Sequence, residues 1–422
     1  MRNRTSRESI VTTNKLPSCM FSACVADREN IINGDHFSWS RRCGIDLFLK
    51  MLLVYINSIG VRHAPESTIY VDEIKNTSMV SNLRDTAEIC DAEKASFICL
   101  NCYSPNKHIK MGVFWPIFKA LTLTVHSLPS ILSFIGSECT VNDRLARLLI
   151  KRMDNYVARV GYRHPYILMT DHHFYSTVIA MNDHVTSAVL QHGLIGDTRF
   201  FSPVRATYFF AWSKKSAFLI NSEKTVDAGT YKFSKLMNLN PEHNVEIFAD
   251  AKRVLLILSS SKTSEQISHR IEPLLSLQKR FGFRLLIKMH PGSLFSSDEL
   301  RAAVSTCDVE LYKEEKIETI DFDFAFIEQS TAALDVACLG IPFIVIDEAF
   351  DSYFSEYKEL LPTACNPDEL LRLAVDFSLS KYMPAYTSFL EREIDNGQCR
   401  VDSLIHHLQS ECLPTYGGRY DR

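Results

Sequence analysis

The sequence predicts an α/β protein with two parallel sheets, one in each half of the chain. Short apolar or β-branched runs of strand length alternate with longer segments in which apolar residues recur at helical spacing. A strand, a helix and a second strand in that order favour a parallel sheet, because the helix returns the chain to the edge where the first strand began. The alternation occurs twice, on either side of a polar stretch at about residues 214–250, and no internal sequence repeat is evident.

Length and composition agree with two domains. The chain has 422 residues, 46% of them hydrophobic and 23% charged, which is enough for about two domains with a core each. The formal net charge of −4 gives no reason to expect nucleic acid as a partner, since binding to a polyanion needs a concentrated basic surface. The twelve cysteines are scattered, as expected for reduced thiols in a cytoplasmic protein.

The N-terminal part of the chain is predicted to be peripheral to the fold. Residues 1–43 are polar and basic and lack the apolar block of a secretory signal, so we expect a flexible basic arm. Two apolar stretches follow, 45–59 and 111–135. The first is short and contains charged residues, and the second is interrupted by a lysine, a histidine and two prolines, so both are predicted as buried or interfacial helices rather than membrane spans.

A group of lysines and aromatic residues in and before the second stretch would suit a peripheral contact with an anionic membrane surface. These residues are Lys107, Lys110, Phe114, Trp115, Phe118 and Lys119.

In the first half, two predicted strands deliver polar side chains to one sheet edge. The strands are predicted at residues 67–71, 95–100, 166–170, 186–190 and 208–212, and the helices at 141–160 and 174–182. Asp171 directly follows one strand, and Gln191, His192 and Gly193 follow the next. Open parallel sheets bind ligands outside the carboxyl ends of their strands, so these residues are predicted to line a site.

The second half repeats this alternation. Its strands are predicted at residues 253–258, 284–289, 324–327 and 343–346, and its helices at about 265–281, 298–305 and 331–339, with helical segments to about 410. We therefore divide the chain into the arm 1–43, an acceptor-side domain 44–225 and a donor-binding domain 226–422. Both domains are expected to be Rossmann-like and to face each other across a cleft.

Three strand ends in the second half carry candidate binding groups. Ser260 lies in a serine-rich loop after the first strand. Lys288 and His290 share a face at the end of the second strand, because strand side chains alternate, and Pro291 then ends that strand. Two cationic or donor groups therefore converge at this point.

The strand 324–327 turns through Glu328, Ser330 and Thr331 into a helix. Free N–H groups at a helix start favour an anion, and Asp335, one turn further on, could accept ribose hydroxyls. Each feature has an ordinary structural alternative: the hydroxyls could simply cap the helix, and His290 could pack under a loop. Their joint occurrence at successive strand ends favours a nucleotide site.

These motifs resemble those of the GT-B glycosyltransferases of bacterial surface polysaccharides. The resemblance lies in residues 187–193 with Gln-His-Gly, 288–291 with His-Pro, and 328–342 with Ser-Thr, and it covers about residues 165–375. It is closest in kind to enzymes with cytidine-nucleotide donors, namely capsule polysialyltransferases and other bacterial sialyltransferases, capsule Kdo transferases and CDP-glycerol glycerophosphotransferases.

The resemblance implies roles for individual residues. His290 matches the histidine that contacts the donor phosphate and stabilises the departing nucleotide, and Ser330 and Thr331 match the hydroxyl pair that binds the same phosphate. Asp335 stands where many GT-B enzymes have a glutamate that holds ribose. The Gln-His-Gly motif is shared by the Kdo and glycerophosphate transferases, whereas the acidic motif that supplies the base in polysialyltransferases has no evident counterpart.

We therefore expect a metal-independent glycosyltransferase that needs no cofactor. It would move a sugar from a nucleotide-activated donor, CMP-linked such as CMP-sialic acid or CMP-Kdo, to a hydroxyl of a capsule or lipopolysaccharide glycan or glycolipid. The expected catalytic residues are His290 and a base that is either Asp171 or His192. The expected donor-binding residues are Gln191, Gly193, Ser260, Lys288, Pro291, Glu328, Ser330, Thr331 and Asp335.

The expected location is the cytoplasm, with peripheral contact to the inner membrane. Two alternatives share the architecture: a nucleotide-sugar epimerase or hydrolase of the UDP-GlcNAc 2-epimerase type, and a non-catalytic scaffold.

Overall fold

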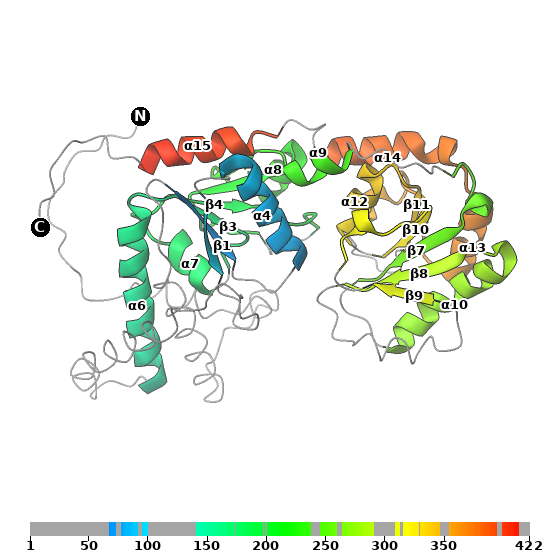
Figure 1. The fold of residues 1–422 in the computed structure, drawn as a ribbon, viewed down its shortest axis with the longest axis horizontal. Coiled ribbons are helices and arrows are strands. Elements are labelled where there is room, and N and C mark those ends of the chain that lie inside the picture. The colour runs from blue at the N-terminus through cyan, green and yellow to red at the C-terminus, as the bar shows by residue number, and fades with distance from the viewer. Residues whose placement is uncertain are drawn as a thin grey trace, which may run out of the picture.

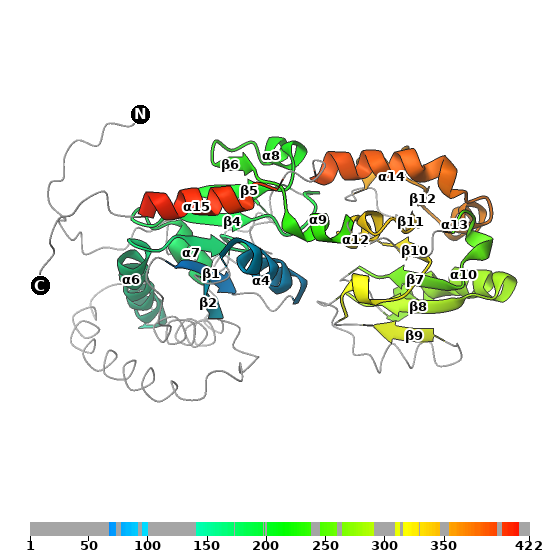
Figure 2. The same ribbon diagram turned by 45° about the horizontal axis from the view of Figure 1, so that its top comes forward.

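The computed structural model contains two α/β units, each built on one parallel sheet (Figures 1 and 2). It describes residues 67–72, 77–91, 95–99, 141–172, 174–196, 198, 201–237, 245–259, 264–290, 309–312, 315–328, 330–346, 354–394 and 399–412. The predicted arm, both predicted interfacial stretches with their lysines and aromatic residues, and the predicted helix at 298–305 lie outside these residues. We call the unit with the first sheet the first unit and the other the second unit.

The sheet of the first unit has six parallel strands in the order β2-β1-β3-β4-β5-β6. They are β1 Thr68–Asp72, β2 Ala95–Cys99, β3 Tyr166–Leu168, β4 Ser187–Leu190, β5 Tyr208–Ala211 and β6 Thr225–Asp227. The central strands are apolar and buried along their length, because helices cover both faces of the sheet.

Helices cover the first sheet in two layers. They are α4 Thr77–Asp91, α6 Val141–Gly161, α7 Phe174–Ala180, α8 Lys214–Ile220 and α9 Tyr231–Met237. On one face Met153 of α6 and Val178 of α7 pack with Leu168. On the other face Leu83 of α4 packs with Tyr70.

The sheet of the second unit has six parallel strands in the order β12-β11-β10-β7-β8-β9. They are β7 Arg253–Ile257, β8 Arg284–Lys288, β9 Val309–Tyr312, β10 Phe324–Ile327, β11 Phe343–Ile346 and β12 Thr363–Ala364. Numbered from its own first strand, this order is 3-2-1-4-5-6, which is the order of Rossmann domains.

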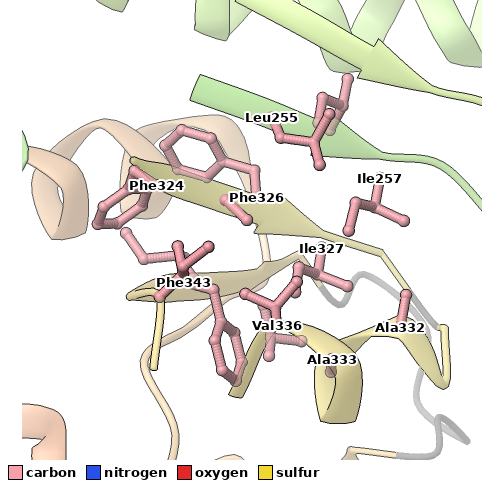
Figure 3. Close-up of a cluster of buried hydrophobic side chains, with 14 of the residues drawn as sticks. Leu255, Ile257, Phe324, Phe326, Ile327, Ala332, Ala333, Val336 and Phe343 are labelled. Atoms are coloured by element: carbon pink, nitrogen blue, oxygen red, sulfur yellow. The ribbon is translucent and has the colours of Figure 1, made fainter. Parts of the chain in front are cut away.

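The core of the second unit is rich in aromatic side chains (Figure 3). Its helices are α10 Ser264–Phe281, α12 Ala332–Cys338, α13 Pro367–Val375 and α14 Leu379–Ile394, with short 3₁₀ helices η2 Phe248–Asp250, η3 Ile317–Thr319 and η4 Ser355–Tyr357. Phe248 packs edge-on against Phe324, with ring centroids 4.9 Å apart. Such pairs add to the burial of apolar area that stabilises this sheet.

The last described helix, α15 Val401–Cys412, returns to the first unit. Its buried residues Ile405 and Leu408 join the core of the first sheet, and Gln409 donates from its Nε2 to the Thr68 hydroxyl at 2.7 Å. The range 226–422, expected as one donor-binding domain, therefore includes a helix that packs on the other sheet, and its boundary falls inside β6.

The predicted fold class, α/β with two Rossmann-like sheets, is confirmed by the two strand orders. Three edge strands, β6, β9 and β12, were not predicted, and β12 has only two residues. β6 has three half-buried residues, and β9 is half-buried throughout, so neither has the continuous apolar run of a central strand. The stretch 214–250, expected as a polar connection, contains α8, β6 and α9.

No helix in the part of the chain that the structure describes is long and apolar enough to cross a membrane.

Candidate functional site

The site is defined by strand ends of the second sheet. Its strand order reverses between β7 and β10, and ligands of open α/β sheets bind in the crevice outside such a reversal. Ser259 follows β7, Lys288 ends β8 with His290 two residues on, and Glu328 follows β10. Ser260 and Pro291, predicted for the same edge, lie outside the described residues.

Glu328 ties together the elements around this reversal. Its Oε2 accepts hydrogen bonds from the Ser259 N–H at 2.9 Å and the Ser259 hydroxyl at 3.1 Å. Its Oε1 pairs with Nε of Arg270 on α10 at 2.7 Å. Since the carboxylate is 2% exposed and occupied by these partners, we interpret Glu328 as a support for the loop after β7 rather than a direct donor ligand.

Lys288 and His290 form the polar pair that their spacing predicts. Lys288 is buried and His290 half-buried. Burial lowers the pKa of His290 below its ordinary value, and the nearby charge of Lys288 lowers it further. The imidazole is therefore neutral at pH 7, with one nitrogen that donates a hydrogen bond and one that accepts. A neutral donor beside a lysine is suited to a phosphate.

Ser330 and Thr331 have different partners, although they are neighbours in the sequence. The Ser330 hydroxyl accepts from the N–H of Ala332, the first residue of α12, at 3.2 Å. The Thr331 Oγ1 accepts from the N–H of Leu194 in the first unit at 3.3 Å. This bond joins residues 137 positions apart, so the Gln-His-Gly and Ser-Thr motifs meet where the units touch.

Gly193 also lies against Thr331. A Cβ atom added to Gly193 would lie 3.3 Å from the Thr331 Oγ1, closer than an ordinary van der Waals contact. The close approach of the two chains therefore favours a residue without a side chain at this position.

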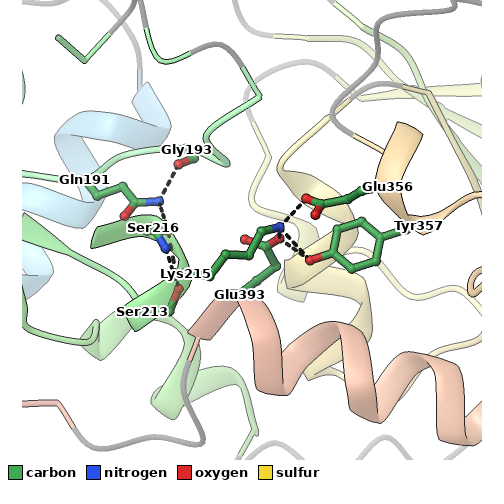
Figure 4. A network of polar contacts seen from close by, with 8 residues as sticks. All are labelled: Gln191, Gly193, Ser213, Lys215, Ser216, Glu356, Tyr357 and Glu393. Carbon is green, nitrogen blue, oxygen red and sulfur yellow. Dashed lines mark hydrogen bonds and ion pairs between the residues drawn. The ribbon is translucent and has the colours of Figure 1, made fainter. Parts of the chain in front are cut away.

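Gln191 positions the Gln-His-Gly loop, by which we mean residues 191–194 (Figure 4). The side chain is fully buried, and its Nε2 donates to the Gly193 carbonyl at 2.8 Å and to the Ser216 hydroxyl at 3.2 Å. Its Oε1 accepts from the N–H of Trp212 at 2.8 Å. Because the amide is used within the first unit, we interpret Gln191 as a positioning residue rather than a donor ligand.

The two candidate bases lie in different surroundings. Asp171 is buried, and its Oδ2 accepts from the N–H groups of Arg205 at 2.5 Å and Ala206 at 3.1 Å. Its Oδ1 lies 3.2 Å from Nε2 of His172. His192 is half-buried in the Gln-His-Gly loop. Because both carboxylate oxygens of Asp171 already have partners in the first unit, the geometry favours His192 as the base.

Asp335 is buried on α12 and pairs with Lys232 of α9, Nζ to Oδ1, at 2.6 Å. Burial raises the pKa of Asp335, whereas the charge of Lys232 acts in the opposite direction. A ribose hydroxyl would therefore have to share this carboxylate with a lysine that the sequence analysis did not single out. Nothing in the polar stretch around Lys232 distinguishes it from a surface lysine.

The described residues contain no group of three or more histidine, cysteine, aspartate or glutamate side chains that could hold a metal ion.

No protein-family model matches the sequence, and no curated protein matches it significantly. Among solved structures, UDP-GlcNAc 2-epimerase from Neisseria meningitidis bound to UDP-GlcNAc is similar over 82% of this chain and 100% of its own, with 11% identity and a TM-score of 0.47. The wall teichoic acid polymerase TagF is similar over 95% of this chain and 100% of its own, with 12% identity and a TM-score of 0.49.

A third structure, the O-GlcNAc transferase of Thermobaculum terrenum, is similar over 94% of this chain and 77% of its own, with 13% identity and a TM-score of 0.40. Similarities at this level do not indicate a substrate or a reaction for this chain.

Proposed function

We propose that this protein is a glycosyltransferase that moves a sugar from a nucleotide-activated donor to a hydroxyl of a bacterial surface glycan. The observation that carries the proposal is the bond from the Leu194 N–H to the Thr331 hydroxyl. It brings an imidazole-bearing loop of one unit against the Ser-Thr motif of the other, and Lys288 and His290 lie at a neighbouring part of the same sheet edge. Sugar transfer needs both acceptor activation and leaving-group stabilisation around one reacting carbon, and in this proposal each unit supplies one of them.

The leaving phosphate would be bound by the second unit. The Lys288 ammonium supplies positive charge, the neutral His290 supplies an N–H donor, and the hydroxyls of Ser330 and Thr331 complete the set. Charge builds on this phosphate as the glycosidic bond breaks, and fixed donors stabilise it without reorganising. Removal of one such donor typically lowers the rate by about two to three powers of ten.

His192 would remove the proton of the acceptor hydroxyl. The loop that carries it is fixed on one side by Gln191 and on the other by the Leu194 bond to Thr331. Asp171 is not part of this proposal, because its carboxylate is occupied inside the first unit.

The finer assignments follow from the motif resemblance. The Gln-His-Gly, His-Pro and Ser-Thr motifs support a CMP-linked donor, such as CMP-sialic acid or CMP-Kdo, and an acceptor in capsule or lipopolysaccharide. Action without a metal ion is proposed because protein donors can stabilise the leaving phosphate. A location in the cytoplasm with peripheral contact to the inner membrane is proposed from the scattered cysteines and from the lysines and aromatic residues at 107–119.

Thermal unfolding with CMP, CDP, UDP and GDP tests the binding part, because a ligand of the native state raises the apparent stability. We expect CMP or CDP to stabilise the wild type and to have less effect on His290→Ala and Ser330→Ala. His184→Ala, a change of an exposed histidine in the first unit, is the matched control and should respond as the wild type does.

Transfer to a capsule or lipopolysaccharide acceptor then tests the reaction, with EDTA present to test metal independence. Glycan synthesis at the wild-type rate by a His290→Ala plus Ser330→Ala variant would refute the proposed roles. Consumption of the donor at the same rate with and without acceptor would favour the epimerase or hydrolase alternative.

A further inference from the structure

A side chain in the first turn of α8 reaches from the first unit to the second (Figure 4). Lys215, in this turn, has a side chain that is 21% exposed. Its Nζ lies 2.8 Å from the Tyr357 hydroxyl and forms ion pairs with Glu356 and Glu393. Tyr357 and Glu356 belong to η4, and Glu393 belongs to α14. The Lys215 ammonium group of the first unit therefore lies among hydrogen-bond acceptors of the second unit.

Of the three partners of Lys215, Glu393 depends most on this contact, because its carboxylate is buried. Its side chain is 4% exposed, and its Oε1 accepts a hydrogen bond from the Tyr357 hydroxyl as well as pairing with Lys215. A carboxylate so deeply buried is unfavourable unless it is paired and hydrogen-bonded. By contrast, Glu356 is 49% exposed and contributes little, because water screens its charge.

The same helix turn holds the Gln-His-Gly loop. Ser216, next to Lys215, accepts on its hydroxyl from the Gln191 Nε2 at 3.2 Å. The Ser213 hydroxyl caps the turn by accepting from the N–H of Ser216 at 3.1 Å. One capped turn thus carries two attachments, one to the loop of its own unit and one to the other unit.

The far end of the loop is attached to the second unit. The Leu194 N–H donates to Thr331, and the Leu194 side chain is 6% exposed within the hydrophobic core of the second unit. The loop is therefore held by α8 through Gln191 and by the second unit through Leu194. Any separation of α8 from α14 would pull on both attachments.

We propose that Lys215 is a positioning residue that couples the approach of the two units to the position of the Gln-His-Gly loop against Thr331. When Lys215 is paired with Glu393, α8 is held against α14, and Gln191 and Leu194 keep the loop between the units. This inference goes beyond the proposed function and does not depend on it, because it concerns the free protein.

The test is the hydrogen-exchange rate of the Leu194 amide in the protein without ligand. In Lys215→Met this amide should exchange about tenfold faster or more, because the Thr331 acceptor is lost whenever the units separate. Lys279→Met, which removes an exposed lysine of α10, is the matched control and should leave the rate unchanged. Lys215→Arg keeps the charge and should restore most of the protection.

A second variant separates coupling from simple loss of stability. Lys215→Met combined with Glu393→Gln removes both charges, so no unpaired carboxylate is buried, yet the attachment is still missing. In this double variant the Leu194 amide should still exchange faster than in the wild type. Ser216→Ala should also raise the Leu194 rate while leaving amides in α14 unchanged.

The opposite pattern would overturn the proposal. If Lys215 only stabilises the second unit, Lys215→Met will speed exchange in η4 and α14, the double variant will reverse this effect, and Leu194 will keep its wild-type rate throughout. Because no nucleotide or acceptor is present, these outcomes are independent of whether the protein transfers a sugar.

Discussion

Gly193 provides a sharp test of the contact between the two motifs. Gly193→Ala places a Cβ 3.3 Å from the Thr331 Oγ1, so the threonine side chain must move by a few tenths of an ångström or rotate away. Either change weakens the Leu194 bond to Thr331. A hydrogen bond of this kind contributes about 0.5–1.5 kcal/mol net, so the expected loss of stability is about 1 kcal/mol.

The expected effect on transfer is larger than the effect on stability. If the Thr331 hydroxyl contacts the leaving phosphate, its displacement should lower kcat by about two powers of ten with a small change in the unfolding midpoint. A larger side chain should do more, since overpacking costs about 1–3 kcal/mol. Gly193→Val therefore ought to lower both activity and stability.

A double-mutant cycle isolates this contact. Thr331→Ala removes the oxygen that the new Cβ meets, so adding Gly193→Ala to it should cost almost nothing further. Thr331→Ser keeps the oxygen, so in that background Gly193→Ala should cost as much as in the wild type. Urea unfolding and initial transfer rates measure the two effects. If Gly193→Ala lowers stability and rate as much in the Thr331→Ala background as in the wild type, the Cβ of Ala does not act through the Thr331 oxygen.

Three further predictions concern ionisable side chains that are buried or half-buried. Arg270→Met leaves the buried Glu328 without its paired cation and should cost about 3–5 kcal/mol in urea unfolding, whereas Arg270→Met combined with Glu328→Gln should recover much of this loss. The pKa of His290, measured by NMR titration, should lie below 6.5 and should rise in Lys288→Gln. Because the unfolded chain binds this proton more readily than the folded protein, the free energy of unfolding should fall as the pH drops through 6.5 and should level off below the folded pKa. The pKa of Asp335 is raised above 3.8, so the wild type should lose stability relative to Asp335→Asn as the pH rises from 3.8 through the folded pKa. If the difference in free energy of unfolding between the two proteins stays constant over that range, the pKa is not raised.

Much of the fold could be predicted because the central strands are apolar and buried from end to end. β4 and β10 are buried from end to end and β8 is buried after its first residue, and the residues at or after their ends are the ones that the structure brings to the edge of each sheet. The edge strands β6 and β9 escaped prediction because half-buried strands need no continuous apolar pattern, and β12 escaped because it has only two residues. Return of α15 to the first sheet could not be predicted, since an apolar helix stripe does not specify which sheet it covers.

The sequence by itself determined which chemical groups stand at the strand ends, because strand periodicity and the breaks after each run depend only on neighbouring residues. Only the tertiary structure decided which of these groups are already paired with other groups of the protein. Glu328 is paired with Arg270, Asp335 with Lys232, and Asp171 with backbone N–H groups, and each partner comes from a distant part of the chain. Hydrogen bonds require partners within about 3 Å, and this proximity is set by the packing of whole elements rather than by any local pattern.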